Sequence, residues 1–261
     1  MKPRVSVVSY LNTVPLVWGM LHGEQRGLFD LSFAIPSECA DRLADGRADI
    51  GIVPSVELNR QKLDIIRGTG IACRGPVRSI LLISKVPFPE IRTFATDSSS
   101  RTSVALSRII LARKYGVEPA LYSQVPHIAR MLEQCDAALV IGDAALVLDP
   151  ATLPFHVLDL GDEWTKMTGL PMVFAVWAAR AELPHQDPQP FTDSLRFGMA
   201  HMDDIVQEWY RKLGISEALA REYLTRNIIF ELGEQEYTGL ATFLQYAAEL
   251  RDSVETKKVS V

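Results

Sequence analysis

Short apolar runs that end in small polar residues recur along the chain, and they predict strands that lead into helices. The first run covers residues 4–8 and ends in the polar turn 9–13, after which apolar positions recur at helical spacing. The run at 92–96 has the same form, with a polar turn at 97–100 before a helical pattern. Strands that are apolar throughout and alternate with helices are typical of sheets covered on both faces. The pattern therefore predicts an α/β fold.

The order of these runs repeats in two halves of the chain. A second apolar run, at residues 49–53, ends at Pro54-Ser55, and its counterpart at 136–141 ends at Gly142-Asp143. The first pair of runs begins 88 residues apart, at positions 4 and 92, and the second pair 87 apart, at 49 and 136. Two pairs in the same order at nearly the same offset predict two lobes of similar design.

Two longer apolar strands, at residues 77–84 and 169–177, suit connections between these lobes. The sequence therefore predicts a two-lobed clamshell of parallel-rich sheets flanked by helices, with a cleft between the lobes. Ligands of open α/β sheets lie beyond the carboxyl ends of the strands, so we expect the ligand in this cleft. The expected first lobe combines residues 1–85 and 174–261, and the second comprises 86–173. Three helical patterns are predicted near the end of the chain, at residues 192–213, 216–226 and 234–251, with Ser216 as an N-cap.

Composition and charge remove several classes of protein. The 261 residues are 48% hydrophobic and 23% charged, as in globular domains, and the net charge of −5 comes without a basic stripe for nucleic acid. No apolar stretch is long enough to span a bilayer, and the N-terminus lacks the apolar region of a secretory signal. Cys39, Cys73 and Cys135 have no CxxC spacing, which fits a reducing compartment. We expect a cytoplasmic protein with neither nucleic-acid nor membrane partners, and its oligomeric state is open.

The turns after the four paired strands are predicted to meet at the cleft. They place hydroxyl, amide or glycine residues where helices begin, and free backbone N–H groups there favour an anion. Arg101 offers a fork that matches a carboxylate, and Ser100, Thr102 and Ser103 supply further donors. The alternative is that Ser100 only caps the helix and Arg101 is solvated.

Several common sites lack a sequence signature. The five histidines are scattered, with neither HExxH nor HxH spacing, so a metal site is not expected. The chain has no GxGxxG, GxxxxGK[ST] or GxSxG motif, so dinucleotide, nucleotide and serine-hydrolase sites lack support.

Five segments form a more specific pattern, at residues 8–16, 48–55, 99–103, 141–146 and 168–177. In the same order they resemble blocks of the chorismate dehydratase family, which acts in the futalosine route to menaquinone. The resemblance covers roughly residues 4–180. It implies the fold of type II periplasmic binding proteins and a reaction without cofactor, in which the small dianionic substrate chorismate loses water to give 3-[(1-carboxyvinyl)oxy]benzoate.

The resemblance also implies roles for individual residues. Asn12 is expected at the reacting centre, holding the departing hydroxyl or orienting a carboxylate, and Ser79 is expected to be a carboxylate or hydroxyl partner. No histidine or lysine lies in these motifs, so one hypothesis is that the substrate's own enolpyruvyl carboxylate accepts the proton. The expected substrate-binding residues are Ser9, Tyr10, Pro54, Ser55, Ser99, Ser100, Arg101, Thr102, Ser103, Gly142, Asp143, Thr168 and Gly169.

Other functions remain open at this point. The synthase of 1,4-dihydroxy-6-naphthoate shares the implied fold, although its opening motif differs from the Ser-Tyr-Leu-Asn turn found here. A solute-binding protein that captures a small anion without turnover is a second alternative, and the missing signal peptide speaks against it. The effector domain of a transcriptional regulator is a third, but it needs a helix-turn-helix segment before Arg4.

Overall fold

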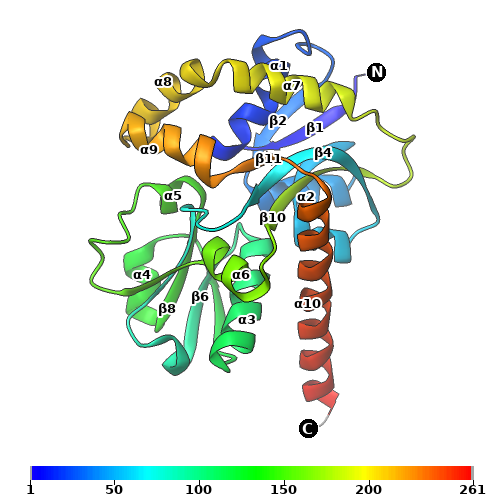
Figure 1. Ribbon diagram of the computed structural model, residues 1–261. Helices are drawn as coiled ribbons and strands as arrows, with labels where there is room; N and C mark the ends of the chain where they lie inside the picture. Colours follow the sequence, from blue (N-terminus) through cyan, green and yellow to red (C-terminus); the bar gives the residue numbers. More distant parts are fainter. Residues whose placement is uncertain (1, 260–261) are drawn as a thin grey trace.

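A computed structural model describes residues 2–259, and the side chains of residues 2–250, as two lobes that are each built on one sheet (Figure 1). The strands are β1 (Arg4–Val8), β2 (Asp30–Ala34), β3 (Ile50–Pro54), β4 (Leu63–Cys73), β5 (Ile80–Ser84), β6 (Thr93–Asp97), β7 (Ala120–Gln124), β8 (Ala137–Ile141), β9 (His156–Asp159), β10 (Met172–Arg180) and β11 (Ile229–Glu231). The helices are α1 (Val14–His22), α2 (Pro36–Ala44), α3 (Arg101–Tyr115), α4 (Ile128–Gln134), α5 (Gly142–Leu146), α6 (Leu160–Thr168), α7 (Gln189–Ala200), α8 (Met202–Leu213), α9 (Glu217–Glu222) and α10 (Glu234–Val259). Short 3-10 turns are η1 (Leu11–Thr13), η2 (Ser55–Asn59) and η3 (Phe88–Glu90), and η4 (Tyr223–Asn227) is a π-helical turn.

The two sheets share one arrangement, which confirms two lobes of similar design. Their strand orders are β11-β4-β10-β3-β1-β2 and β7-β6-β8-β5-β9. In the first sheet β1 lies between the parallel strands β2 and β3, and in the second β6 lies between the parallel strands β7 and β8. The next strand is antiparallel in both sheets, β10 beside β3 and β5 beside β8.

This topology corrects two expectations. The predicted first lobe included residues up to 85, but β5 pairs with β8 and β9 and so belongs to the second sheet. The apolar runs at 77–84 and 169–177 were predicted as connections between the lobes, whereas most of each run is a strand inside a sheet, β5 or β10. Both strands run antiparallel to their neighbours, so each sheet is mixed. Burial on both faces makes a strand apolar throughout, whichever way it runs.

The helical patterns near the end of the chain are interrupted more often than predicted. The pattern at 192–213 is divided at His201, which ends α7 and precedes α8. The pattern at 216–226 begins as expected, because the Ser216 hydroxyl accepts a hydrogen bond from the Leu219 N–H at 3.1 Å, but it finishes in the π-helical turn η4.

Helix α10 contacts both lobes and covers the second connection between them (Figure 1). Its Leu240 packs into the core of the first lobe, and the ring of Phe243 meets Trp164 of α6 at a centroid distance of 6.1 Å. At Gly239 the helix lies so close to Pro171 that a Cβ would stand 2.0 Å from the proline carbonyl oxygen. The C-terminal helix therefore ties the lobes together beside the connection.

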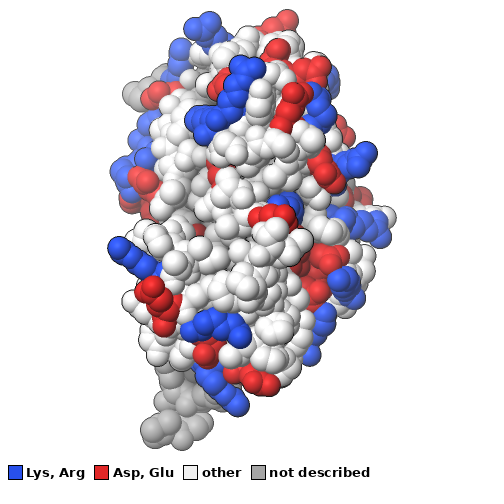
Figure 2. Space-filling view, turned by 90° about the vertical axis from the view of Figure 1, so that its left-hand side faces the viewer, with Lys and Arg blue, Asp and Glu red and all other residues white. Residues whose placement is uncertain are grey.

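Charges of both signs are interspersed on the surface. On the face shown in Figure 2, basic and acidic side chains lie next to one another, with uncharged areas between these groups. This face carries no basic stripe of the kind that binds nucleic acid. Within residues 2–259, no helix has both the length and the apolar character needed to cross a membrane.

Candidate active site

A small cavity of about 60 Å³ lies between the lobes, where the carboxyl ends of strands from both sheets meet the starts of the following turns and helices. It is lined by eight of the residues expected from the sequence: Tyr10, Asn12, Pro54, Ser79, Ser100, Thr102, Ser103 and Gly142. Apolar side chains complete the wall: Val8, Pro36, Ile71, Ile80, Ile141, Phe174 and Ala175. The cavity thus combines a few hydroxyl and amide groups with apolar surface.

Asn12 reaches the cavity from the tight turn after β1. Leu11 and Thr13 on either side are buried, which fixes the backbone of η1, while Asn12 itself is half-buried and lines the cavity. The Thr13 hydroxyl donates to the Asn12 side-chain oxygen at 3.4 Å. That contact orients the amide with its nitrogen away from Thr13.

Ser79 is placed by a strained connection. Arg78, the residue before it, has a φ of 68°, a left-handed conformation that costs a non-glycine residue about 1–2 kcal/mol. The Asp159 carboxylate compensates by accepting hydrogen bonds from the backbone N–H groups of Val77 at 3.0 Å and Arg78 at 2.6 Å. The carbonyl oxygen of Ser79 accepts a hydrogen bond from the Gly142 N–H at 2.8 Å. Backbone strain held in place by its surroundings is typical of functional sites.

The amino end of α3 borders the cavity opposite these residues. Ser100 occupies the N-cap position, its side chain makes no capping hydrogen bond, and the first turn holds no acidic residue. Backbone N–H groups in the first turn of a helix have no partner within the helix and carry partial positive charge. With the Thr102 and Ser103 side chains in the cavity wall, this end of the cavity is suited to an anion.

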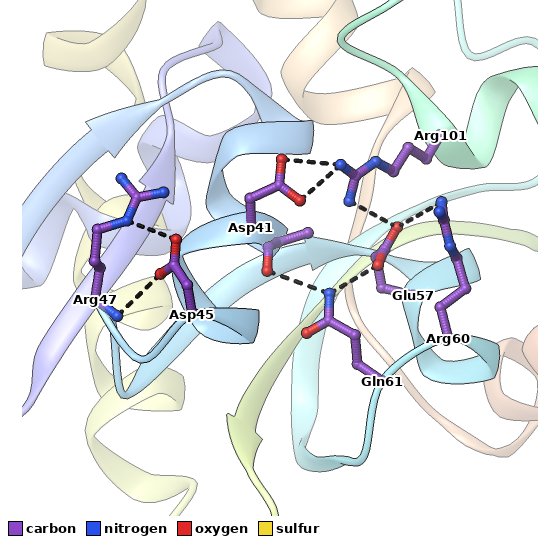
Figure 3. A network of polar contacts seen from close by, with 8 residues as sticks. Asp41, Asp45, Arg47, Glu57, Arg60, Gln61 and Arg101 are labelled. Atoms are coloured by element: carbon purple, nitrogen blue, oxygen red, sulfur yellow. Dashed lines mark hydrogen bonds and ion pairs between the residues drawn. The ribbon is translucent and has the colours of Figure 1, made fainter.

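Arg101, expected to be a carboxylate fork for the substrate, does not line the cavity and is paired with carboxylates of this chain. Its Nη2 lies 2.7 and 2.9 Å from the two carboxylate oxygens of Asp41, and its Nη1 lies 3.2 Å from Glu57 Oε1 (Figure 3). Glu57 is 1% exposed and also pairs with Arg60 at 3.3 Å. The Arg101 guanidinium therefore binds carboxylates of this chain and joins α3 of the second lobe to α2 and η2 of the first.

Three serines in the predicted turns lie outside the cavity lining and stabilise the local backbone. The Ser9 hydroxyl donates to the Ala34 carbonyl at 3.3 Å, and the Ser55 hydroxyl donates to the Val173 carbonyl at 2.7 Å. The Ser99 hydroxyl donates to the Asp97 carboxylate at 2.6 Å. Their residue types signalled turns, which is the role they have here.

Thr168 and Gly169 also lie outside the cavity lining, at the end of α6. The Thr168 hydroxyl donates to the Trp164 carbonyl at 2.8 Å and accepts from the Leu170 N–H at 3.1 Å. Gly169 has a φ of 72° and ends the helix in the left-handed conformation that glycine favours. Both residues shape the second connection between the lobes.

Asp143 bridges the lobes beside the cavity. Its carboxylate accepts a hydrogen bond from the Leu11 N–H at 3.0 Å, across the interface between α5 and η1. Burial raises its pKa, although the Leu11 hydrogen bond and the charge of Lys212 on α8 oppose the shift. Next to it the Tyr10 ring covers Gly142, where a Cβ would stand 2.8 Å from the ring.

Together these contacts close the lobes on each other. Besides the pairs of Arg101 and Asp143, the Thr102 hydroxyl accepts from the Val56 N–H at 3.2 Å, and the Ser99 carbonyl accepts from the Ser37 N–H at 3.0 Å. Binding sites for small molecules usually enclose about 300–1,000 Å³, several times this cavity.

Tyr223 is the polar residue next to the cavity that the sequence analysis missed. Its hydroxyl lies 2.8 Å from the Ser79 hydroxyl, and it also hydrogen-bonds the side chain of Asn12. Tyr223 is 144 residues from Ser79 and lies in a segment predicted as an ordinary helix, so no local pattern marked it. Asp159 was missed as well, although its place just before a helix is a signal of an N-cap.

The described residues hold neither a cluster of potential metal ligands nor a disulfide. Among residues 2–250, no three or more His, Cys, Asp or Glu side chains lie together as potential metal ligands. Cys39, Cys73 and Cys135 are buried and unpaired.

Two mixed α/β lobes with a cavity at their interface define a protein of the periplasmic-binding-protein fold. Solved structures agree on this architecture. The periplasmic aliphatic sulphonate binding protein SsuA of Escherichia coli has a TM-score of 0.61 at 12% identity, covering 96% of this chain and 87% of SsuA. Protein AF1704 of Archaeoglobus fulgidus has a TM-score of 0.73 at 17% identity, covering 96% of this chain and 98% of AF1704.

Within this fold, the chain belongs to the menaquinone biosynthesis family, which it matches over residues 3–249. It is also similar to the chorismate dehydratase of Thermus thermophilus, with 29% identity over 265 residues, covering 94% of this chain and 95% of the relative.

Arg101→Gln is expected to lower the free energy of unfolding by roughly 2–3 kcal/mol, because it leaves the buried Glu57 carboxylate with one of its two arginine partners. Urea denaturation at neutral pH measures the change. The control is Arg47→Gln, whose partner Asp45 is half-exposed and whose loss is expected to cost at most about 0.5 kcal/mol (Figure 3). Equal losses in the two variants would show that the pair between the lobes contributes no more than a surface pair.

Asp143→Asn is expected to become more stable relative to the parent protein as the pH rises. The folded-state pKa of Asp143 is raised, so the carboxyl contributes stability below its unfolded pKa that is lost as the pH rises through its folded pKa. The amide keeps an oxygen for the Leu11 N–H and does not ionise.

Thermal unfolding between pH 4 and pH 8 follows this difference. Asp45→Asn is the control, since the Arg47 hydrogen bond lowers the pKa of Asp45, and the pH trend of that variant should have the opposite sign. A pH-independent difference for Asp143→Asn would contradict the assignment.

Proposed function

We propose that the protein is a chorismate dehydratase, which eliminates water from chorismate without a cofactor and releases 3-[(1-carboxyvinyl)oxy]benzoate for menaquinone biosynthesis. The observation that carries the proposal is the cavity itself, with Asn12 and Ser79 on one side and the amino end of α3 on the other. Membership of the menaquinone biosynthesis family and similarity to the Thermus thermophilus enzyme support it.

The proposed reaction is an elimination that makes the ring aromatic. The ring carbon that bears the enolpyruvyl ether loses its proton, and the electron pair of that C–H bond becomes part of the new ring double bond. The neighbouring hydroxyl leaves and, with a proton, forms water. Aromatisation drives the reaction, so the protein contributes mainly by orienting the substrate and by assisting the proton transfers.

The substrate carries two carboxylates, and hydrogen-bond donors of the cavity are placed to bind them. The amino end of α3, with the Thr102 and Ser103 hydroxyls, receives one carboxylate. The side chains of Asn12 and Ser79 bind the departing hydroxyl or the second carboxylate on the opposite side. Ile71, Ile80 and other apolar side chains of the wall pack against the ring. Anion binding thus depends on N–H and O–H groups, in place of the arginine fork expected from the sequence.

The substrate itself supplies the base in this proposal. Of the described side chains that line the cavity, Tyr10 is the one with an ionisable group, and burial raises its pKa, so the phenol keeps its proton at neutral pH. A protonated phenol is no general base. The enolpyruvyl carboxylate of chorismate is linked through the ether oxygen to the carbon that is deprotonated, and in this proposal it accepts the proton. Lobe closure excludes water and strengthens the polar contacts during this step.

Two further expectations remain predictions. These are the cytoplasmic location and the absence of nucleic-acid and membrane partners.

Purified protein mixed with chorismate, without added metal or nucleotide, is expected to form a product lighter by one water molecule. Chromatography with mass detection measures it, and aromatic absorbance gives its rate. Bound but unchanged chorismate would favour an anion-binding protein. If the protein neither binds nor converts chorismate, the proposal is wrong. The 1,4-dihydroxy-6-naphthoate synthase reaction then becomes the next one to test.

Asn12→Ala is expected to lower kcat by about 100-fold, the effect of removing one donor that acts in the transition state, with a smaller change in KM. Steady-state kinetics with chorismate measures both. The control is Asn59→Ala, because Asn59 is exposed and its amide donates to the Leu244 carbonyl away from the cavity. Unchanged turnover in Asn12→Ala would remove Asn12 from the reacting centre.

A further inference from the structure

We propose that Tyr223 is a positioning residue, whose buried hydroxyl orients Ser79 and Asn12 so that both present their donors to the substrate. The inference rests on the proposed function for its kinetic consequence, but its structural basis is independent of the substrate. Tyr223 itself does not line the cavity. It acts through two residues that do.

The backbone around Tyr223 is unusual. Tyr223 is the first residue of η4, and its carbonyl accepts a hydrogen bond from the Ile228 N–H, five residues on, at 3.2 Å. Such π-helical turns are rare and frequently lie at functional sites. The turn follows α9 and precedes β11. Its Tyr223 side chain contacts Ser79, at the end of the first connection between the lobes. The side chain is 1% exposed.

The protonation state of Tyr223 determines the direction of its hydrogen bonds. Burial raises the pKa of the phenol, and the contacts with Ser79 and Asn12 offset this only in part, so the hydroxyl is protonated at neutral pH. It has a single proton, which it donates to the Ser79 oxygen at 2.8 Å. Asn12 must then be the donor in its contact with the phenol oxygen, through its amide nitrogen.

This chain of hydrogen bonds leaves defined donors for the cavity. Because the Ser79 oxygen accepts a hydrogen bond from Tyr223, the hydroxyl proton of Ser79 is not used in that contact. Ser79 lines the cavity, so this proton can be donated to a ligand there. The Asn12 oxygen is occupied by the Thr13 hydroxyl, so its amide nitrogen serves the phenol with one N–H and has a second N–H left. The two side chains expected to meet the reacting groups are therefore both oriented as donors by one phenol.

The Tyr223 hydroxyl is not needed to fill space. A phenylalanine ring would fill nearly the same space, and an unpaired buried hydroxyl costs about 1–3 kcal/mol. A tyrosine at a fully buried position is favourable here because its oxygen meets Ser79 and Asn12. The backbone of Ser79 is held by the hydrogen bond from Gly142 and by the strained conformation of Arg78. The phenol of Tyr223 holds the Ser79 side chain.

The kinetic test compares Tyr223→Phe with Tyr237→Phe. Tyr237 is a matched control, because its hydroxyl accepts one hydrogen bond from the Gly68 N–H at 2.9 Å, away from the cavity. Tyr223→Phe is expected to lower kcat for chorismate about ten-fold with KM changed by less than about two-fold, since the lost interaction acts in the transition state. Tyr237→Phe should keep kcat and change only the unfolding midpoint. Equal kcat in Tyr223→Phe and the parent enzyme would overturn the proposal.

A double-mutant cycle separates positioning from stability. In a Ser79→Ala background, Tyr223→Phe is expected to lower kcat by clearly less than ten-fold, because one of the two groups that it orients is missing and only its effect through Asn12 is left. A full additional ten-fold loss would show that Tyr223 acts independently of Ser79 and would overturn the proposed orientation of Ser79.

Crystal structures of the parent protein and Tyr223→Phe supply a readout that needs no activity. The variant is expected to show a changed or mixed rotamer at Ser79 and a reoriented Asn12 amide, whereas Tyr237→Phe should show neither. If the parent protein does not convert chorismate, the proposed function fails and this comparison alone decides the role of Tyr223. Unchanged Ser79 and Asn12 in the variant would overturn the proposal in either case.

Discussion

The site depends on one partly buried carboxylate, that of Asp159, which accepts hydrogen bonds from four backbone N–H groups. Two belong to Val77 and Arg78 in the first connection, and two belong to Gly161 and Asp162 at the start of α6. Burial raises the pKa of this carboxyl even though all four donors oppose the shift. One side chain thus caps a helix and holds a left-handed residue in place, and the position of Ser79 follows from both.

Much of this arrangement could be predicted from the sequence, and the exceptions have physical causes. The repeated strand-and-turn pattern predicted two similar lobes, and the turns that it marked supply most of the polar lining of the cavity. The contacts of Arg101 could not be predicted, because residue type and position in a turn do not say which way a helical side chain points, and Arg101 pairs with Asp41 and Glu57 of the other lobe. Tyr223 could not be predicted, since only the folded chain brings it to Ser79.

The proposed site binds an anion without a cationic side chain in its wall, and this choice suits the chemistry. Substrate and product of the proposed reaction carry the same two carboxylates, so a guanidinium clamp would hold both equally and slow release of the product. Uniform binding of this kind does not raise kcat. In the proposed reaction, neutral donors at the end of α3 would bind the anion more weakly, and Asn12 and Ser79 would act where the bonding changes.

The strand order has a consequence for how the chain is made. In the first sheet β10 lies between β3 and β4, so the group β2-β1-β3 and the pair β4-β11 are joined only through residues 172–180. The second sheet is formed entirely by residues 80–159. During synthesis from the N-terminus, the second lobe has all its strands before the first lobe receives β10, the strand that joins its two parts. Until residues 172–180 are made, the edges of β3 and β4 that pair with β10 are without this partner, although all strands of the second lobe already exist.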